Sequence, residues 1–375
     1  MFFGNCFLRK LSHLKSILKI NYVMTNKPDI FSIWENIKEE KKKAQELGLS
    51  SITKREVLIV DGYNTFCRAF MAIPTLNEDG LHTGGMTGFL KSVGYVLKQF
   101  QPDRCVIVFD GIGGSMKRRA IYSEYKEHRK TKVRLNRIYE NTSLNDEEIS
   151  MKKQLQRLVI YLGSLPVNVI SLDNVEADDT IAYLALDSFK DWNSIIMSSD
   201  KDFLQIVNDH IRVWSPTKKR LYGPQDVLNE YGISSQNFVY FRALCGDDSD
   251  NIPGVRGCGL KTVVKAFPML SGASMDVGDL YVTSVANSGK LKVYDTIVQN
   301  WQDVERNYAL MQLTDTALTT MAQLHVKEIL DNPIPKLNRF ELAKLIGEDK
   351  VTNNIPNFPN WVNECFSKLN NFIKD

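Results

Sequence analysis

Several features are absent from the sequence, and each absence narrows what the protein can be. No apolar run reaches about eighteen residues, the length that a helix needs to span a bilayer, so we expect no membrane span. The six cysteines are scattered and form no Cys-x-x-Cys pair. That distribution argues against a thiolate metal site and is typical of reduced, buried thiols in a reducing compartment. Neither an internal repeat nor a low-complexity tract is present.

Length and composition are those of an ordinary globular chain in which charge is unevenly distributed. The 375 residues exceed one typical domain, so we expect one large domain with a smaller addition. The formal net charge is only +3. Residues 115–137, however, carry nine Lys or Arg against two Glu, whereas Asp and Glu bunch elsewhere. Local charge is therefore more informative than net charge.

The N-terminal segment is basic, because its first 28 residues contain five Lys or Arg and no acid. Such a segment can be an organelle-targeting helix. The simpler interpretation, which we favour, is that Met24 is the true start. The protein is then expected to be cytoplasmic. Residues 30–47 are predicted to form a charged helix.

Short β-branched runs end at aspartates three times along the chain. Residues 57–60 precede Asp61, residues 105–109 precede Asp110, and residues 194–197 come shortly before Asp200 and Asp202. Helical stretches separate these runs, which predicts an α/β fold with a mostly parallel central sheet and flanking helices. Because ligand sites in such folds lie at the carboxyl edge of the sheet, we expect these aspartates to converge.

Two further groups of acids have a structural explanation as well as a functional one. Glu176, Asp178 and Asp179 begin an apolar helix, where acids cap free N–H groups and complement the helix dipole. Asp247 and Asp250 belong to a stretch that would also suit a turn. The nine acids taken together are harder to explain in this way, because carboxylates gathered at one edge repel one another unless cations neutralise them.

The composition of this acidic group indicates which cation it would hold. Oxygen ligands without Cys or His favour Mg²⁺ or Mn²⁺ over Zn²⁺. Two such ions a few ångströms apart form the usual clamp for in-line cleavage of a phosphodiester. We therefore predict that the nine acids bind two divalent cations.

A basic segment follows the second of these strands directly. Its Arg and Tyr residues are spaced by 4, 3 and 4, which predicts one face of a helix over about 115–135. The residues concerned are Arg118, Tyr122, Tyr125 and Arg129, with Arg119 and Lys126 beside them. A helix face that carries cations to bind phosphates and aromatic rings to stack on bases is typical of proteins that bind single-stranded nucleic acid. A solvated, charged helix is the alternative.

Residues 251–265 are glycine-rich and predict two helices joined by a tight loop. Gly254, Gly257 and Gly259 would let the backbone approach a phosphate, and the start of the following helix offers free N–H groups. Lys261 and Lys265 lie one turn apart on that helix. The alternative is that this segment is only a tight turn. A dinucleotide-binding loop is excluded because no predicted strand precedes the segment.

These motifs divide the chain into four predicted parts. Residues 1–54 form an N-terminal extension and residues 55–222 an α/β catalytic domain. Residues 223–300 form a helical subdomain that binds nucleic acid, and residues 301–375 form a C-terminal helical region.

In combination, the motifs between about residues 55 and 275 resemble those of the flap endonuclease and 5′→3′ exonuclease family. The resemblance is greatest to stand-alone bacteriophage 5′-nucleases of the RNase H and flap exonuclease type. The matching motifs are Asp61-Gly62 with Arg68-Ala69, Phe109-Asp110-Gly111, Tyr125-Lys126 with Arg129, Glu176-Ala177-Asp178-Asp179, Asp200-Lys201-Asp202 and Gly246-Asp247 with Asp250-Asn251.

The resemblance implies a PIN-like nuclease core, an arch helix through which a 5′ single strand threads, and a helix-hairpin-helix that binds duplex DNA. Lys126 with Arg118 or Arg129 would stabilise charge on the scissile phosphate, and the hairpin loop would hold a K⁺ ion. The two metal ions would be divided among the acids. One would lie among Asp61, Asp110, Glu176 and Asp178, and the other among Asp179, Asp200, Asp202, Asp247 and Asp250.

The function that follows is hydrolysis of a phosphodiester near a 5′ junction, leaving a 5′-phosphate and a 3′-hydroxyl. The expected substrates are flapped or branched DNA and RNA–DNA hybrids. We expect a monomer that acts with replication proteins in DNA replication or repair. A ribonuclease of the PIN-like class and a non-catalytic junction binder are alternatives. A phosphatase of the haloacid dehalogenase type would need an aspartate where this chain has Tyr63.

Overall fold

The part of the chain from Lys54 onward is built around one six-stranded sheet. The computed structural model describes residues 54–127, 143–315 and 318–371. The N-terminal extension, the helix predicted over 30–47 and Arg129 lie outside the described residues.

The strands follow the order β3-β2-β1-β4-β5-β6 across the sheet. They are β1 Glu56–Asp61, β2 Arg104–Asp110, β3 Asn168–Leu172, β4 Asn193–Met197, β5 Ile211–Ser215 and β6 Arg220–Tyr222. The first five are parallel, and β6 pairs antiparallel with β5. In the centre, Val57 of β1 pairs with Arg104 on one side and Ser194 on the other. The predicted mostly parallel sheet is confirmed, and β3, β5 and β6 extend it beyond the three strands seen in the sequence.

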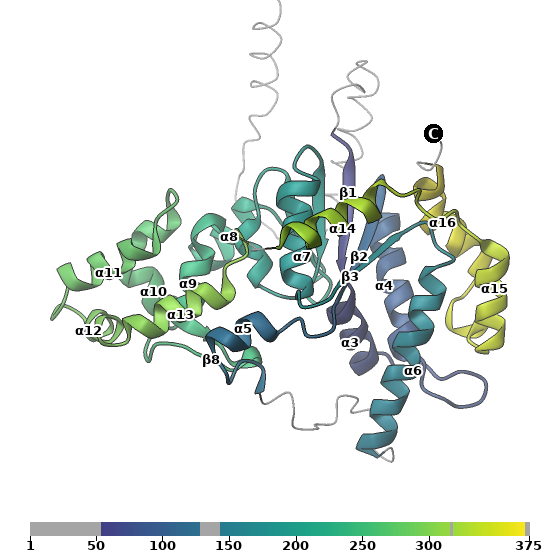
Figure 1. Ribbon diagram of the computed structural model, residues 1–375, viewed down its shortest axis with the longest axis horizontal. Helices are drawn as coiled ribbons and strands as arrows, with labels where there is room; N and C mark the ends of the chain where they lie inside the picture. The colour runs from purple at the N-terminus through teal and green to yellow at the C-terminus, as the bar shows by residue number, and fades with distance from the viewer. Residues whose placement is uncertain (1–53, 128–142, 316–317, 372–375) are drawn as a thin grey trace, which may run out of the picture. The chain divides into compact units, whose positions relative to one another are not determined.

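Helices flank the sheet, with α7 on one side and α3, α4 and α6 on the other (Figure 1). The helices up to β6 are α3 Gly62–Ala72, α4 Gly84–Phe100, α5 Met116–Ile121, α6 Leu144–Leu162 and α7 Ala177–Tyr183, which a π-helical turn, Leu184–Ser188, continues. The later ones are α8 Pro224–Tyr231, α9 Phe238–Cys245, α10 Leu260–Ala266, α11 Val277–Ala286, α12 Lys292–Gln299, α13 Trp301–Met311, α14 Thr320–Asp331, α15 Arg339–Glu348 and α16 Phe358–Asn371. No helix in the described ranges is both long and apolar enough to cross a bilayer.

Short turns of 3-10 helix lie between these elements. They are η4 Asp202–Ile206, η5 Ser235–Asn237, η6 Asp248–Asp250, η7 Pro268–Ser271 and η8 Thr352–Asn354. A second, two-stranded sheet pairs β7 Gly246–Asp247 with β8 Ile252–Pro253.

Successive residues of the central strand face opposite layers. Val57 and Ile59 join the core beneath α7 and the helices that follow β6, whereas Leu58 and Val60 join the core beneath α3, α4 and α6. All six residues of β1 are buried, because helices cover both faces of a parallel sheet. This packing leaves the carboxyl ends of the parallel strands at one edge of the sheet.

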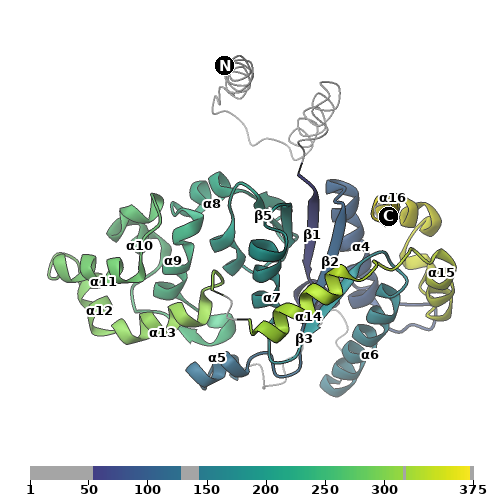
Figure 2. The same cartoon turned by 45° about the horizontal axis from the view of Figure 1, so that its top comes forward.

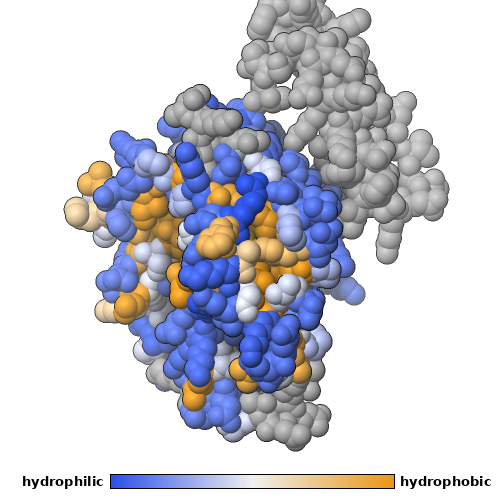
Figure 3. Space-filling view, turned by 90° about the vertical axis from the view of Figure 1, so that its right-hand side faces the viewer, coloured by the Kyte–Doolittle hydropathy of each residue, from blue (hydrophilic) through white to orange (hydrophobic). Residues whose placement is uncertain are grey.

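The C-terminal helices α15 and α16 lie in the layer of α4 and α6 (Figure 2). Val362 and Phe366 of α16 are buried in the same cluster as Phe89 of α4. Arg157 of α6 forms an ion pair with Asp349, just after α15, at 2.7 Å. The view onto this side is mostly hydrophilic, with hydrophobic residues between (Figure 3). The C-terminal region therefore completes one face of the α/β core.

Up to Glu127, where the described part of the basic segment ends, the chain does not form the arch helix that was predicted over about 115–135. The helix α5 ends at Ile121, Tyr122 is extended, and turns follow as far as Glu127. Lys126 has a φ of 55°, which an α-helix does not allow. Helical spacing fails here because Tyr125 turns inward and packs against Ile252 and Leu310.

The glycine hairpin is also longer than expected. Its first helix is α9, which ends at Cys245, before the acids at 247 and 250 rather than after them. The β7–β8 pair and η6 intervene before α10 begins at Leu260. The acids are therefore part of the connection between the two helices, and a prediction of two helices within 251–265 was wrong.

Candidate active site

The carboxyl ends of β1 and β2 carry the first two acids of the site. Asp61 ends β1 and caps α3, because its Oδ1 accepts a hydrogen bond from the backbone N–H of Asn64 at 3.1 Å. Asp110 ends β2, and its Oδ1 accepts from the backbone N–H of Ala177 at 2.9 Å. That second bond ties the end of β2 to the start of α7. It brings the acids around residue 177 to the same edge of the sheet.

Ser198 links the acids after β4 to Asp61. Its hydroxyl donates to Oδ2 of Asp61 at 2.8 Å, and its Oγ accepts from the backbone N–H of Asp200 at 3.0 Å. The backbone N–H of Asp202 in turn donates to Oδ1 of Asp200 at 2.8 Å. Ser198 was not predicted as a site residue. Its position one residue after a buried strand was the only signal in the sequence.

Burial and the charges of neighbouring acids shift the pKa values of two carboxyls, those of Asp61 and Asp178, upward. Burial raises the pKa of Asp61 to about 7; hydrogen bonds from Ser198 and Asn64 oppose the shift, and the charges of Asp200 and Asp110 add to it. Burial, followed by the charges of Asp200 and Asp61, raises the pKa of Asp178 well above its ordinary value. A group of acids that resists ionisation in this way is one that a bound cation would stabilise.

Arg118 supplies positive charge to two acids of α7. Its Nη1 lies 2.7 Å from Glu176 and 2.9 Å from Asp179, and its Nη2 lies 2.9 Å from the other oxygen of Asp179. Its Nε donates to the backbone carbonyl of Leu310 at 2.8 Å, so the end of α13 fixes the guanidinium plane. The side chain is only 11% exposed. Arg118 is thus an internal ion-pair partner in this structure rather than part of an open basic face.

Tyr125 and Lys126 also turn toward the acids. The Tyr125 hydroxyl donates to Glu176 at 3.0 Å and to Asp250 at 3.2 Å, and the side chain is buried. The ammonium of Lys126 lies 2.9 Å from Glu176 and 3.8 Å from Asp250. Burial alone would raise the pKa of Glu176, but Lys126 and Arg118 outweigh it and lower that pKa.

A third basic residue, Arg242 of α9, was missed by the sequence analysis. Its Nε donates to Asp202 at 2.5 Å, and its Nη2 forms a short ion pair with Asp247. Burial raises the pKa of Asp202 to about 7 despite this partner, with Asp200 adding to the shift. The signal in the sequence was a single arginine in the otherwise apolar run 238–245, one turn before an acidic stretch.

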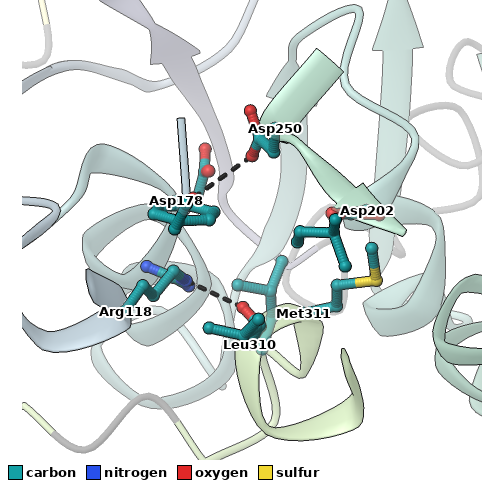
Figure 4. Close-up of a pocket in the computed structure, with 9 residues that line it drawn as sticks. Arg118, Asp178, Asp202, Asp250, Leu310 and Met311 are labelled. Carbon is teal, nitrogen blue, oxygen red and sulfur yellow. Dashed lines mark hydrogen bonds between the residues drawn. The ribbon is translucent and has the colours of Figure 1, made fainter. Parts of the chain in front are cut away.

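Several of these groups line one pocket (Figure 4). The labelled residues around it are Arg118, Asp178, Asp202, Asp250, Leu310 and Met311. The dashed contacts join Tyr125 to Asp250 and Arg118 to the Leu310 carbonyl. All nine predicted acids lie at or next to the carboxyl edge of the sheet, and they come from five separate segments of the chain.

Other predicted residues lie away from this acidic group. Arg119 is exposed on α5, and the Tyr122 hydroxyl donates to Glu124 instead of to the acids. The hairpin residues are exposed on the loop before α10 or on that helix; they are Gly254, Gly257, Gly259, Lys261 and Lys265. The hairpin still begins at the site, because the Asn251 side chain donates to the Glu124 carbonyl at 2.8 Å.

The donor set suits a hard divalent cation, since it contains only carboxylate oxygens, and burial raises the pKa values of Asp61, Asp178 and Asp202 among these acids. In the described ranges, no three Asp, Glu, His or Cys side chains are placed so that they could hold a metal ion together. Arg118, Lys126 and Arg242 instead supply positive charge to five of the acids. Asp61, Asp110, Asp178 and Asp200 form no ion pair among those same residues, although the charge of Lys126 acts on Asp178.

The sheet, its strand order and its acid-lined edge define a PIN-like fold, and solved structures share this fold. The chain is similar to the flap endonuclease of bacteriophage T5 solved with DNA and metal ions, with a TM-score of 0.61 and 20% identity over 74% of this chain and 98% of that one. A structure of the T5 5′-exonuclease with bound zinc matches with a TM-score of 0.59 and 19% identity, over 75% and 100% of the two chains.

Sequence comparisons identify the family. Residues 56–232 match the model of the 5′-3′ exonuclease N-terminal resolvase-like domain. The 5′-3′ exonuclease of Buchnera aphidicola from Schizaphis graminum is 31% identical over 56% of this chain and 69% of its own length, and that of Aquifex aeolicus is 27% identical over 71% and 80%. DNA polymerase I of Bacillus caldotenax is 32% identical, but over only 23% of its length. The chain belongs to the 5′-3′ exonuclease family and is a nuclease.

Proposed function

We propose that this nuclease is a structure-specific, metal-dependent hydrolase that cuts DNA at flapped or branched 5′ ends and removes RNA from RNA–DNA hybrids. The observation that carries the proposal is the group of four acids, Asp61, Asp110, Asp178 and Asp200, that form no ion pair with a described side chain. The T5 relative was solved with DNA and metal ions, which supports the same substrate class here.

The residues that would hold two Mg²⁺ or Mn²⁺ ions divide by location. The four acids that form no ion pair among the described residues would hold one ion, and because no three described acids are placed to hold a metal ion in this structure, their side chains would draw together on binding. Asp202, Asp247 and Asp250, next to the hairpin, would hold the other. When bound, such ions activate water and neutralise charge on the reacting phosphate.

Lys126 is the residue of this chain best suited to contact the scissile phosphate. Its ammonium already lies at the acidic edge, 2.9 Å from Glu176. Lysine is a compact point charge on a flexible stem, so it can exchange a carboxylate for a phosphate when divalent ions neutralise the acids. Arg118 is held by Glu176, Asp179 and the Leu310 carbonyl. We assign it to keeping those two acids in place.

The hairpin would bind the duplex next to the cut. Lys261 and Lys265 are exposed on α10 and can pair with phosphates of one strand. The loop carbonyls between Gly254 and Gly259 would suit a K⁺ ion. This arrangement would place a duplex on one side of the acids and a 5′ strand on the side of α5.

The test is Asp110→Asn, assayed on a 5′-flap substrate with Mg²⁺. The asparagine oxygen can keep the hydrogen bond from the Ala177 N–H, so the fold is expected to survive. Loss of one metal-binding carboxylate should lower cleavage by at least about a hundredfold, while flap binding in EDTA stays within about twofold of wild type.

Asp248→Asn is the matched control, because Asp248 is an exposed acid of the same edge with no assigned role. It should leave cleavage unchanged. Full cleavage by Asp110→Asn would refute the proposal. One gel that compares a 5′ flap, a nick and an RNA–DNA hybrid would show which substrate is preferred.

A further inference from the structure

Arg242 is fully engaged by two acids and a carbonyl that approach it from different elements. Asp202 follows β4, and Asp247 lies in β7 at the base of the hairpin. The Nε atom bonds Asp202 at 2.5 Å, Nη2 pairs with Asp247, and Nη1 donates to the Gly246 carbonyl at 3.3 Å. The side chain is 11% exposed. Each guanidinium nitrogen therefore has a partner, which fixes the orientation of the group.

This engagement separates the acids of the site into two kinds. Asp61, Asp110, Asp178 and Asp200 form no ion pair with a described cationic side chain, and only the charge of Lys126 acts on one of them, Asp178, so a divalent ion arriving there breaks no ion pair among the described residues. At Asp202 and Asp247 the two negative charges already share one guanidinium. An ion that binds these two acids therefore competes with the guanidinium for their negative charge.

We propose that Arg242 is the resident counter-ion of the Asp202–Asp247 pair and sets the order in which two divalent ions bind. The first ion binds at the four acids that form no ion pair among the described residues, and the second binds more weakly because it competes with the guanidinium. This inference rests on the proposed metal-dependent function and adds a positioning residue to it. Arg242 also holds the base of the hairpin against η4 while the second ion is absent.

The test is a titration of the full-length chain with Mn²⁺ in the absence of DNA, in which electron paramagnetic resonance counts the free ion. Wild type is expected to bind one ion tightly and a second at least tenfold more weakly. Arg242→Gln, which keeps part of the side chain but not its charge, should tighten the second ion at least tenfold and leave the first within about twofold.

Arg220→Gln is the matched control. Arg220 also bridges two acids, with Asp226 at 2.8 Å and Glu230 at 3.1 Å, but on the surface beside β6. The control should bind both ions as wild type does. Arg242→Lys is a second variant in case Arg242→Gln does not fold. One ammonium cannot bridge both acids as the guanidinium does, so the affinity for the second ion should rise, but by less than in Arg242→Gln.

Thermal unfolding gives a second measurement that needs no titration. In EDTA, Arg242→Gln should unfold at a lower temperature than wild type, because Asp202 and Asp247 lose their partner. Saturating Mn²⁺ should raise its unfolding temperature more than it raises that of wild type. The Arg220→Gln control should show the wild-type response to Mn²⁺.

Two outcomes separate this inference from the proposed function. Equal affinities for two ions in wild type, or a second-ion affinity unchanged in both Arg242 variants, would overturn the role of Arg242 while leaving Mg²⁺-dependent cleavage intact. Absence of any Mn²⁺ binding by wild type would refute the metal-dependent function itself, and the inference with it.

Discussion

Asp61→Asn is expected to stabilise the metal-free protein while it stops cleavage. Asp61 is 5% exposed, and its carboxylate faces other acids without a cationic partner among the described residues. Burial, reinforced by Asp200 and Asp110 and opposed by bonds from Ser198 and Asn64, raises its pKa to about 7. Ionised Asp61 therefore costs stability whenever no metal ion is bound, and a neutral asparagine removes that cost.

The magnitude follows from the two ionisation states. The ordinary pKa of this carboxyl is 3.8, so the stability linked to its proton is complete below that pH and is lost as the pH rises to about 7. The change from 3.8 to about 7 corresponds to about 4 kcal/mol at pH 8. Asparagine weakens the contact with Ser198, which is worth about 1 kcal/mol. The net gain should be about 3 kcal/mol.

The assay is urea unfolding in EDTA at pH 8 and pH 5. At pH 8 the variant should exceed wild type by about 3 kcal/mol, and at pH 5, where the folded wild type keeps the proton, by less than about 1 kcal/mol. Asp79→Asn is the control: this half-exposed acid pairs with Lys350 on the surface and should change stability by less than about 0.5 kcal/mol. A variant no more stable than wild type at pH 8 would refute the reasoning.

Two further predictions test the core and the hairpin. Phe366 of α16 is buried, so Phe366→Ala should lower the free energy of unfolding by about 3–5 kcal/mol in a urea titration. The control is Phe340→Ala on α15: this side chain is 81% exposed, and its loss should change the free energy of unfolding by less than about 0.5 kcal/mol. Equal effects would place α16 outside the core. Gly259 has an ordinary φ of −75°, and an added Cβ would have nothing within 4 Å, so Gly259→Ala should leave the free energy of unfolding unchanged. The same variant should weaken duplex binding several-fold, measured by fluorescence anisotropy. The control, Gly347→Ala on α15, should leave duplex binding unchanged. Unchanged binding by Gly259→Ala would show that this glycine does not approach the duplex.

Much of the core could be predicted because its signals are local. The runs before Asp61 and Asp110 are β-branched and end at an acid, and the alternation of strands with helices fixes the parallel arrangement. Once the strands are parallel, their carboxyl ends share one edge. The short strands β5 and β6 were missed because residues 211–222 mix polar and apolar residues without a clear period.

The basic segment shows where local reasoning fails. Spacing of 4, 3 and 4 between Arg118 and Arg129 is helical in period, but α5 stops at Ile121. Tyr125 gains more by burying its ring against Ile252 and Leu310 than a solvent-exposed helix could provide. Tertiary packing overrides helical periodicity at this point, as it does for weak propensities in general.

The sequence by itself determined which acids could meet, because strand ends, helix starts and a turn each have a local pattern. Tertiary structure decided which of them receive an internal counter-charge. Arg118 reaches Glu176 across 58 residues and Arg242 reaches Asp202 across 40, and no periodicity records such pairings. They depend on how α5 and α9 pack against the sheet edge, since an ion pair exists only where two surfaces bring its charges within a few ångströms.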